Sequence, residues 1–426
     1  MFDVLIIGGG AAGFYAAIHI AEADRALKVG ILERGKEVLG KVKVSGGGRC
    51  NVTHAEFDPG ELVKNYPRGE KELLGPFHTY CSGDTVSFFQ ERGIELKIEE
   101  DGRMFPTTDS SQTIIDCFLN EADRLGVRIL RHSSVTGIEQ TTLSNKEKGW
   151  KVTSVKSSYE ARKLLVATGG NPKIWNLLQK LGHTIVPPVP SLFTFNIKDE
   201  RINGIPGLST QAKVEVLAKK ATISKITIKL RSQKAEEVLL SDEGPVLITH
   251  WGLSGPAILK LSAWGAILMN QYNYRFHIRV NWLPDFNKGA VVSYLMDVKD
   301  VEGKKTALRT KVFEIPRRLW ANLVRAAGII EATKWADTTK EQLQALADQL
   351  TECEFLVDGK GTFKEEFVTC GGVALNDVQS KTLQHKKIEH LYFAGEVLDI
   401  DAITGGYNFQ AAWTTAYVAA QSIVST

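Results

Sequence analysis

The first fifty residues carry the pattern that most constrains the fold. An apolar run at residues 2–7 leads into a glycine-rich turn, a helical pattern at residues 14–23, and a second apolar run at residues 28–32 that ends at Glu33. This order of strand, turn, helix, strand and acid is typical of a unit that binds the ADP part of a dinucleotide. The chain is therefore expected to open with an α/β domain built on a buried parallel sheet.

Each residue of the turn has an expected physical role. Gly8 would form the tight turn, Gly10 would let backbone approach a pyrophosphate, and Gly13 would let the helix pack closely on the strand. Ala11 and Ala12 belong to the same turn, and the N-terminus of the helix that follows offers unpaired N–H groups and a partial positive charge to phosphates. These five residues are expected cofactor contacts.

A second glycine-rich segment follows the acid. Glu33 can accept hydrogen bonds from a ribose, Arg34 follows it, and Lys41 is interpreted as a phosphate contact or a solvated charge. Three successive glycines further along allow close backbone approach to a ligand, whereas a mobile surface loop is the alternative. The place of this segment after the ribose acid favours a loop that faces the cofactor. Its expected contacts are Ser45, Gly46, Gly47, Gly48, Arg49, Cys50 and Asn51.

Charge and cysteine content narrow the class of protein. The 426 residues carry a net charge of +3, which is too small to indicate nucleic acid or an anionic membrane as the main partner. The five cysteines lie far apart without a C-x-x-C pair, so neither a metal site nor a redox dithiol is expected, and a reducing cytoplasm is the expected location. Glycines interrupt the apolar stretch at residues 4–21, which is therefore not interpreted as a membrane span.

The middle of the chain predicts a three-stranded meander over residues 127–138, 150–155 and 159–167. Small residues at the end of its last strand would let backbone approach the cofactor. A helix is expected to begin after Ser110 and to run to Arg124. The expected cofactor contacts of this region are Val135, Ala167, Thr168 and Gly169.

The end of the chain repeats the pattern of the beginning. Residues 387–394 predict an apolar strand, a segment with glycines and acids follows, and residues 411–425 predict a helix. A helix N-terminus that faces the cofactor ring can stabilise negative charge on it. The expected contacts here are Gly395, Glu396, Asp399, Gly405, Gly406, Tyr407 and Asn408.

The domain organisation follows from a change of pattern after the prolines at 187, 188 and 190. Residues 1–190 and 355–426 are expected to form the cofactor-binding domain. Residues 191–354 are expected to form an inserted domain for substrate or partner. Antiparallel strands are predicted there at residues 191–197, 212–217, 221–230, 238–240 and 274–282, and helices from about residue 287 to residue 350.

These segments together resemble the HI0933-like family, also described as BaiN- or YhiN-like NAD(P)/FAD-dependent oxidoreductases. The resemblance rests on residues 8–13, 45–51, 249–256, 371–373 and 395–408. It implies an α/β, Rossmann-like two-dinucleotide-binding-domain FAD fold with an inserted β-barrel plus helical domain. One class of members reduces a carbon–carbon double bond conjugated to a ketone.

Two positions differ from the family pattern. His54 stands where many members carry asparagine, and Ala402 stands where a glycine is expected. Both are expected on the flavin or substrate side.

Two functions remain open at this point. The first is an FAD-dependent oxidoreductase that transfers a hydride between flavin and a small organic substrate, with NADH or NADPH as a transient donor. No second G-x-G-x-x-G follows Gly170, so such a donor must dock at the flavin face or at the insert. The second is a flavin-binding electron carrier or redox sensor whose protein partner binds the insert.

The candidate catalytic residues are Tyr407, His250 and Arg49. Tyr407 or His250 would supply a proton to substrate, although a structural loop histidine explains His250 equally well. Cys50 has no neighbouring thiol and is interpreted as a packed residue rather than a redox group. Because ligands favour domain interfaces, substrate is expected between the insert, the 249–256 loop and Tyr407, near Arg49.

Overall fold

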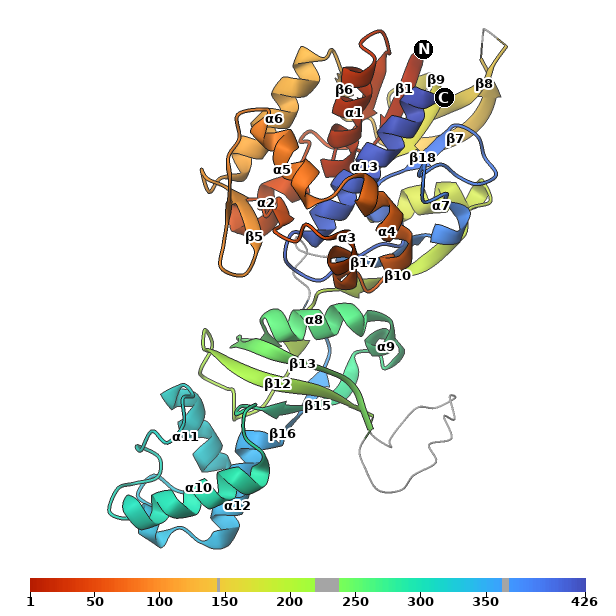
Figure 1. Ribbon diagram of the computed structural model, residues 1–426. Coiled ribbons are helices and arrows are strands. Elements are labelled where there is room, and N and C mark those ends of the chain that lie inside the picture. The colour runs from red at the N-terminus through yellow and green to blue at the C-terminus, as the bar shows by residue number, and fades with distance from the viewer. Residues whose placement is uncertain (144–145, 219–236, 362–367) are drawn as a thin grey trace. The chain divides into compact units, whose positions relative to one another are not determined.

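The computed structural model divides the chain into two compact units, each with its own hydrophobic core (Figure 1). Unit 1 comprises Met1–Ser191 and Phe363–Thr426, and unit 2 comprises Leu192–Thr362. The structure describes residues 1–143, 146–218, 237–361 and 368–426. Among these residues, no helix is both long and apolar enough to cross a membrane.

The main sheet of unit 1 has the strand order β6-β2-β1-β9-β8-β7, with β18 also paired to β9. β6, β2, β1, β9 and β18 pair with one another in parallel, whereas β8 is antiparallel to both β7 and β9. β1 is almost wholly apolar and buried, as expected for a parallel strand covered on both faces. The strands are β1 (Phe2–Ile7), β2 (Val29–Leu32), β6 (Arg128–Leu130), β7 (Val135–Thr142), β8 (Lys148–Ser154), β9 (Ser158–Val166) and β18 (Leu391–Phe393).

The predicted meander is confirmed as β7-β8-β9, but its first strand was placed wrongly. Residues 127–138 form two strands, β6 and the start of β7, rather than one. The chain turns between them at His132, whose φ of 56° is outside the strand region. β6 then pairs with β2 and forms the opposite edge of the sheet from β7.

The helices of unit 1 cover this sheet. α6 begins where the sequence predicts, because the Ser110 hydroxyl accepts the Gln112 N–H in an N-cap at 3.3 Å. The helices are α1 (Ala11–Ala23), α2 (Gly40–Gly48), α3 (Pro59–Leu62), α4 (Glu70–Thr79), α5 (Ser82–Gln90), α6 (Ser111–Arg124), α7 (Pro172–Lys180) and α13 (Tyr407–Ser425), with 3-10 turns at Val63–Asn65, Leu375–Asp377 and Gly395–Val397. Smaller sheets contain β3 (Thr53–His54), β4 (Leu96–Ile98) and β5 (Arg103–Pro106), and β10 (Ile185–Ser191) with β17 (Val368–Val373).

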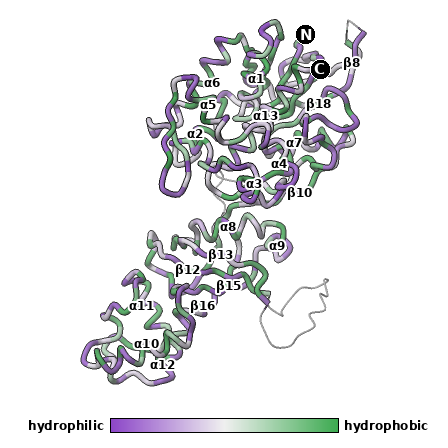
Figure 2. The backbone as a smooth tube through the Cα atoms, viewed as in Figure 1, coloured by the Kyte–Doolittle hydropathy of each residue, from purple (hydrophilic) through white to green (hydrophobic). Residues whose placement is uncertain are grey.

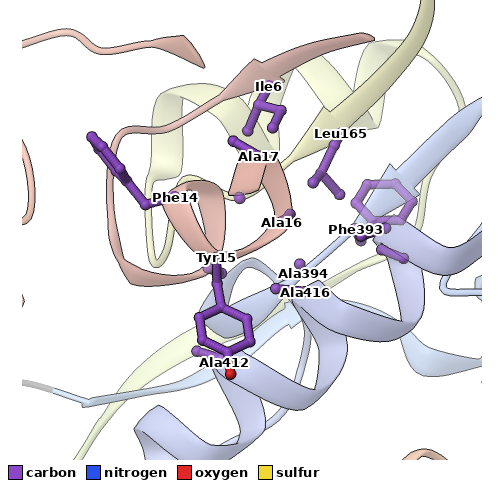
Figure 3. Packing of buried hydrophobic residues seen from close by; sticks show 14 of the residues in the cluster. Ile6, Phe14, Tyr15, Ala16, Ala17, Leu165, Phe393, Ala394, Ala412 and Ala416 are labelled. Carbon is purple, nitrogen blue, oxygen red and sulfur yellow. The ribbon is translucent and has the colours of Figure 1, made fainter. Parts of the chain in front are cut away.

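α1 and α13 pack closely although they lie at opposite ends of the sequence. Figure 3 shows Ala16 of α1 near Ala416 of α13, with Tyr15 beside Ala412. All four side chains are buried. Small residues at this contact let the first and last parts of the cofactor domain approach each other, and each large side chain buried with them contributes about 1.5–3 kcal/mol.

Unit 2 combines a closed antiparallel sheet with helices, which confirms the predicted β-barrel and helical insert. Its strand order is β11-β14-β13-β12-β15-β16. The two edges meet where the Asn196 N–H donates to the Gly359 carbonyl at 3.1 Å and the Gly361 N–H donates to Thr194 at 2.9 Å. The strands are β11 (Phe195–Asn196), β12 (Ser209–Ala218), β13 (Glu237–Ile248), β14 (Gly252–Ser254), β15 (Arg275–Asn281) and β16 (Cys353–Asp358).

The helices of unit 2 are α8 (Pro256–Trp264), α9 (Ala266–Gln271), α10 (Lys288–Val301), α11 (Arg317–Ala326) and α12 (Lys340–Thr351), with a 3-10 turn at Trp335–Asp337. In Figure 2 the chain alternates between hydrophobic green and hydrophilic purple along this unit, as expected for helices and strands with one buried face. The strand predicted at residues 221–230 lies outside the described residues.

The predicted domain limits need one correction. The first limit, at residue 190, lies one residue from the observed division. The second, at residue 354, falls inside β16, which pairs with β15 from Arg275 to Val280. Because this strand completes the barrel, the division follows residue 362 instead.

Candidate flavin site

Three glycine segments begin at one edge of the main sheet. In the parallel register, the last residues of four neighbouring strands are in line; these are Leu32 of β2, Ile7 of β1, Val166 of β9 and Phe393 of β18. The segments that follow β1, β9 and β18 therefore start side by side. Ligands of open α/β sheets bind outside the carboxyl ends of the strands, so this edge is the candidate site.

Crowding explains two glycines of the first segment. A Cβ atom on Gly8 would lie 2.3 Å from the Ala167 carbonyl oxygen, and one on Gly13 would lie 2.0 Å from the Gly8 carbonyl oxygen. Gly395, at the start of the third segment, has a φ of 73° and would place a Cβ 3.0 Å from that of Ala12. The segment after β1 thus packs against the segments after β9 and β18, at distances and in backbone conformations that only glycine permits.

Another glycine of the segment after β1, and two glycines of α2, face open space. A Cβ on Gly10, Gly47 or Gly48 would meet no atom within 4 Å. Gly10 is also the N-cap of α1, where no side chain caps the helix. The first N–H groups of α1 therefore remain available to an anion, and the backbone around them is uncovered. This arrangement fits the pyrophosphate of FAD.

Glu33 is held at the end of β2, beside the glycine turn. Its carboxylate accepts the Gly9 N–H at 3.0 Å and the Gly35 N–H at 2.7 Å. Each carboxylate oxygen has a second lone pair, so the side chain can still accept a ribose hydroxyl. Arg34, the next residue, has an exposed side chain. The position and charge of Glu33 fit the ribose of FAD.

Lys41 connects the glycine-rich helix α2 to the C-terminal part of the chain. Its ammonium group forms an ion pair with Glu396, whose other oxygen accepts the Thr369 N–H at 3.0 Å. The Lys41 side chain is 59% exposed, so the pair contributes little stability. The sequence predicts a phosphate contact or a solvated charge at Lys41, and the structure gives this side chain a carboxylate partner.

Asn51 ties the Ser-Gly-Gly-Gly segment to the start of α13. In the orientation that satisfies both ends of its amide, the oxygen accepts the Gly406 N–H at 2.9 Å and the nitrogen donates to the Thr53 carbonyl at 3.0 Å. A Cβ on Gly406 would lie 2.5 Å from that same carbonyl oxygen. The Trp413 indole N–H also donates to the Val52 carbonyl at 2.9 Å. Residues predicted separately as cofactor contacts are thus joined directly.

This junction places an aromatic pair beside the glycine segments. The rings of His54 and Tyr407 stack with centroids 4.5 Å apart, and His54 Nδ1 lies 3.0 Å from the Gly405 carbonyl oxygen. The Tyr66 hydroxyl donates to the Tyr407 carbonyl at 2.6 Å. Burial raises the pKa of the Tyr407 phenol to about 12, so it keeps its proton at neutral pH. His54 was noted in the sequence only as a departure from the family pattern.

Arg49 makes several contacts within unit 1. Its guanidinium forms ion pairs with Glu99 at 2.6 Å and Asp109 at 3.5 Å, and lies 3.9 Å from the centre of the Phe105 ring. About one third of the side chain is exposed. These contacts orient Arg49, while its expected contact with substrate or ring stays a prediction.

Cys50 is fully buried and has a φ of 62°. Burial raises the pKa of its thiol to about 12, so the reactive thiolate is absent at neutral pH. Its N–H donates to the Ser45 carbonyl at 3.0 Å, which tightens the glycine segment. A packing role near the cofactor accounts for these observations.

The remaining predicted contacts of unit 1 lie close to the same segments. Val135 is buried at the start of β7, two residues after Ser133, whose N–H donates to the Glu33 carbonyl at 2.8 Å. Asp399 accepts the Gly371 N–H at 3.0 Å, and burial raises the pKa of its carboxyl.

Asn408 closes a turn around the residue that departs from the family pattern. Its amide accepts the Ala402 N–H at 3.0 Å and donates to the Ala402 carbonyl at 3.1 Å. The Ala402 backbone is therefore held by a side chain from the start of α13.

The loop at residues 249–256 belongs to unit 2, and packing within that unit explains its glycines. A Cβ on Gly252 would lie 2.1 Å from the Phe195 carbonyl oxygen, and one on Gly255 would lie 2.8 Å from the Leu247 nitrogen. His250 is exposed. Its predicted role as a proton donor, and the predicted pocket shared with Tyr407, stay predictions because they involve both units.

Comparison with known sequences agrees with this geometry. The HI0933-like protein Rossmann domain matches residues 2–422. The ribosomal RNA dihydrouridine synthase of Haemophilus influenzae is 30% identical, with 98% of each chain covered. The enzyme of the same name from Escherichia coli is 28% identical over 100% of this chain and 98% of the relative. The 3-dehydro-bile acid delta(4,6)-reductase of Clostridium scindens is 27% identical, again with 98% of each chain covered.

Solved structures share the fold at low sequence identity. The 3-ketosteroid-delta4-(5alpha)-dehydrogenase of Rhodococcus jostii matches with a TM-score of 0.50 and 13% identity, covering 100% of this chain and 97% of that one. The 3-ketosteroid delta1-dehydrogenase of Sterolibacterium denitrificans matches with a TM-score of 0.51 and 12% identity, covering 100% and 99%. The sequence resemblance is thus confirmed: the chain belongs to the HI0933-like family and is an FAD-dependent oxidoreductase with a Rossmann-type fold.

Proposed function

We propose that this enzyme reduces a carbon–carbon double bond that is conjugated to a carbonyl group. The activities for which two kinds of relative are named have this chemistry in common. A dihydrouridine synthase saturates the C5–C6 bond of uracil, which is conjugated to the C4 carbonyl. A 3-dehydro-bile acid delta(4,6)-reductase acts on double bonds conjugated to a C3 ketone. The shared reaction adds two electrons and two protons, as one hydride and one proton, while the carbonyl is retained.

The observation that carries the proposal is the His54–Tyr407 pair beside the glycine segments. Bound FAD supplies hydride chemistry, and the protein must supply the second hydrogen as a proton. The hydride reaches the carbon β to the carbonyl, and the proton reaches the α carbon. Tyr407 carries a proton at neutral pH, as a phenol ordinarily does, burial raises its pKa further to about 12, and its ring is oriented by the stack on His54.

The size of the substrate is a separate question. The sequence predicts a small organic molecule, and the relative named for a bile acid supports that prediction. The two relatives named for ribosomal RNA are slightly more similar to this chain and favour a second candidate, a uracil base within RNA. The reacting bond is of the same type in both candidates.

The test is a two-step anaerobic experiment on the purified flavoprotein. The flavin is first bleached with NADH or NADPH, and then mixed with 2-cyclohexenone, with cyclohexanone, or with cyclohexene. A uridine-containing RNA is compared with the same RNA that already contains dihydrouridine. The proposal expects reoxidation only by acceptors with a conjugated double bond, together with the saturated product. Equal and slow reoxidation by all acceptors would contradict the proposal and favour an electron carrier.

A further inference from the structure

Two short parts of unit 2 are strongly basic, residues 219–234 and residues 303–325, and the structure describes the second of them. Residues 303–325 contain seven lysines and arginines and one acid, Glu314, for a net charge of +6. The whole chain has a net charge of only +3, so the remainder has a net charge of −3. A local cation surface of this size attracts a polyanion even though the average charge of the protein does not.

Three of these cations line one cavity. Arg309 and Lys311 come from the loop between α10 and α11, and Arg317 is the first residue of α11. Together with Leu308 and Trp320 they enclose about 330 Å³. The cavity therefore offers three cationic groups that can reach one backbone phosphate or adjacent phosphates.

The start of α11 is an unfavourable place for arginine within the folded chain. Arg317 and Arg318 occupy its first turn, where the helix dipole disfavours cations. This turn contains no acid, and no side chain caps the helix. A bound anion would interact favourably both with the arginines and with the free N–H groups of the helix.

The ion pairs in this region leave the cations accessible. Lys311 pairs with Glu314 at 2.6 Å and Arg309 pairs with Glu331 at 3.4 Å. Glu314 is 93% exposed and Arg309 is 77% exposed, so each pair contributes little stability and is readily exchanged for a phosphate. Within the described residues, Arg317 and Arg318 have no ion pair.

We propose that this basic surface, made of Arg309, Lys311, Arg317 and Arg318, binds the phosphate backbone of a substrate RNA. The proposal rests on the second candidate of the proposed function, a uracil base within RNA. Phosphate contacts carry no base specificity, so this surface would supply affinity and orientation while the flavin site selects the base.

The test uses the full-length flavoprotein and a fluorescein-labelled RNA hairpin with uridines in its loop. Arg309→Gln, Lys311→Gln and Arg317→Gln are combined in one variant. The control variant combines Lys148→Gln, Lys151→Gln and Lys180→Gln, three exposed lysines of unit 1 with the same total charge. Fluorescence anisotropy gives Kd between about 50 and about 200 mM salt, and thermal melting verifies that both variants are folded.

We expect the unit 2 variant to lower the slope of log Kd against log salt by about 2–3, because each lost phosphate contact removes about 0.7–0.9. Its Kd should rise at least tenfold, whereas the control variant should change Kd by less than threefold. An equal loss in both variants, or no RNA binding by the unaltered protein, would overturn the proposal.

Reoxidation by 2-cyclohexenone distinguishes this proposal from the proposed function. Both variants should keep the cyclohexenone rate of the unaltered protein, since none of the substituted residues lies at the flavin site. A protein that binds RNA through this surface but reduces neither cyclohexenone nor RNA would contradict the proposed function and leave the RNA surface standing.

Discussion

The two units use glycine and charge differently. In unit 1 the crowded glycines, Gly8 and Gly13, hold segments together, while Gly10 and Gly47 leave open space where a cofactor can approach. In unit 2 the glycines of the 249–256 loop, Gly252 and Gly255, are crowded and serve strand packing, whereas a Cβ would meet no atom within 4 Å on three glycines outside that loop, Gly204, Gly207 and Gly328. The concentrated positive charge, by contrast, belongs to unit 2. A glycine pattern therefore indicates a ligand only where the structure leaves space beside it.

The largest expected effect tests the crowded and open glycines of unit 1. Gly13→Ala places a methyl group 2.0 Å from the Gly8 carbonyl oxygen and should cost about 3 kcal/mol or more, a loss of about 10 °C in Tm. Gly10→Ala meets no protein atom and should lower stability by less than about 1 kcal/mol. It should nevertheless weaken FAD binding, because the methyl occupies the space assigned to the pyrophosphate. Calorimetry and FAD titration measure the two effects, and full FAD affinity in Gly10→Ala would move the pyrophosphate elsewhere.

The next largest effect is expected from the loss of the proton donor, and it tests which of the two units supplies the proton to substrate. Tyr407→Phe should slow the substrate half-reaction by about 10²-fold or more, and leave flavin reduction unchanged, because it removes only the donated proton. Tyr159→Phe, at the start of β9, is the matched control. His250→Ala tests whether the proton comes instead from a residue of unit 2. If neither Tyr407→Phe nor His250→Ala changes the stopped-flow rate by more than about twofold, the proton comes from another group.

A smaller effect is expected at the ribose position. Glu33→Gln removes the charge from a carboxylate held by the Gly9 and Gly35 N–H groups, and should weaken FAD binding about tenfold to a hundredfold. Glu37→Gln, an exposed acid in the same loop, is the control. Unchanged affinity of Glu33→Gln in a fluorescence titration would assign the ribose contact to another residue.

The smallest effect is expected at the cysteines. Cys50→Ser should keep flavin reduction within about tenfold, because the buried thiol stays protonated and hydride transfer needs no thiolate. Cys353→Ser, a buried thiol of unit 2 whose pKa is raised to about 11, should behave alike. A thousandfold slower bleaching in Cys50→Ser alone would show that Cys50 takes part in electron transfer.

Local patterns predicted the backbone of the site well. The close packing at Gly13 followed from its spacing, and the cap at Ser110 followed from residue type, whereas the contact between Gly8 and Ala167 was not predicted. The turn at His132 was missed because its positive φ has no glycine to signal it. The return to unit 1 was placed too early because the apolar pattern of β16 does not reveal its pairing with β15.

Contacts between residues far apart in the chain could not be predicted from the sequence. The contact between His54 and Gly405 joins residues 351 positions apart, and no local spacing indicates it. The carboxylate partners of Arg49 come likewise from strands and loops that the sequence does not connect to it. The basic surface was concealed by the small net charge of the whole chain, since acids elsewhere offset it.

The meeting of three glycine segments at one sheet edge is tested most directly by the flavin that the purified protein carries. Heat release followed by chromatography should yield FAD, non-covalently bound, at about one molecule per chain, because Glu33 and the α1 N-terminus fit the ADP half. Gly10→Ala should be purified folded but depleted of flavin. Release of FMN, or a protein that binds no flavin after reconstitution, would contradict the assignment of this edge as the FAD site.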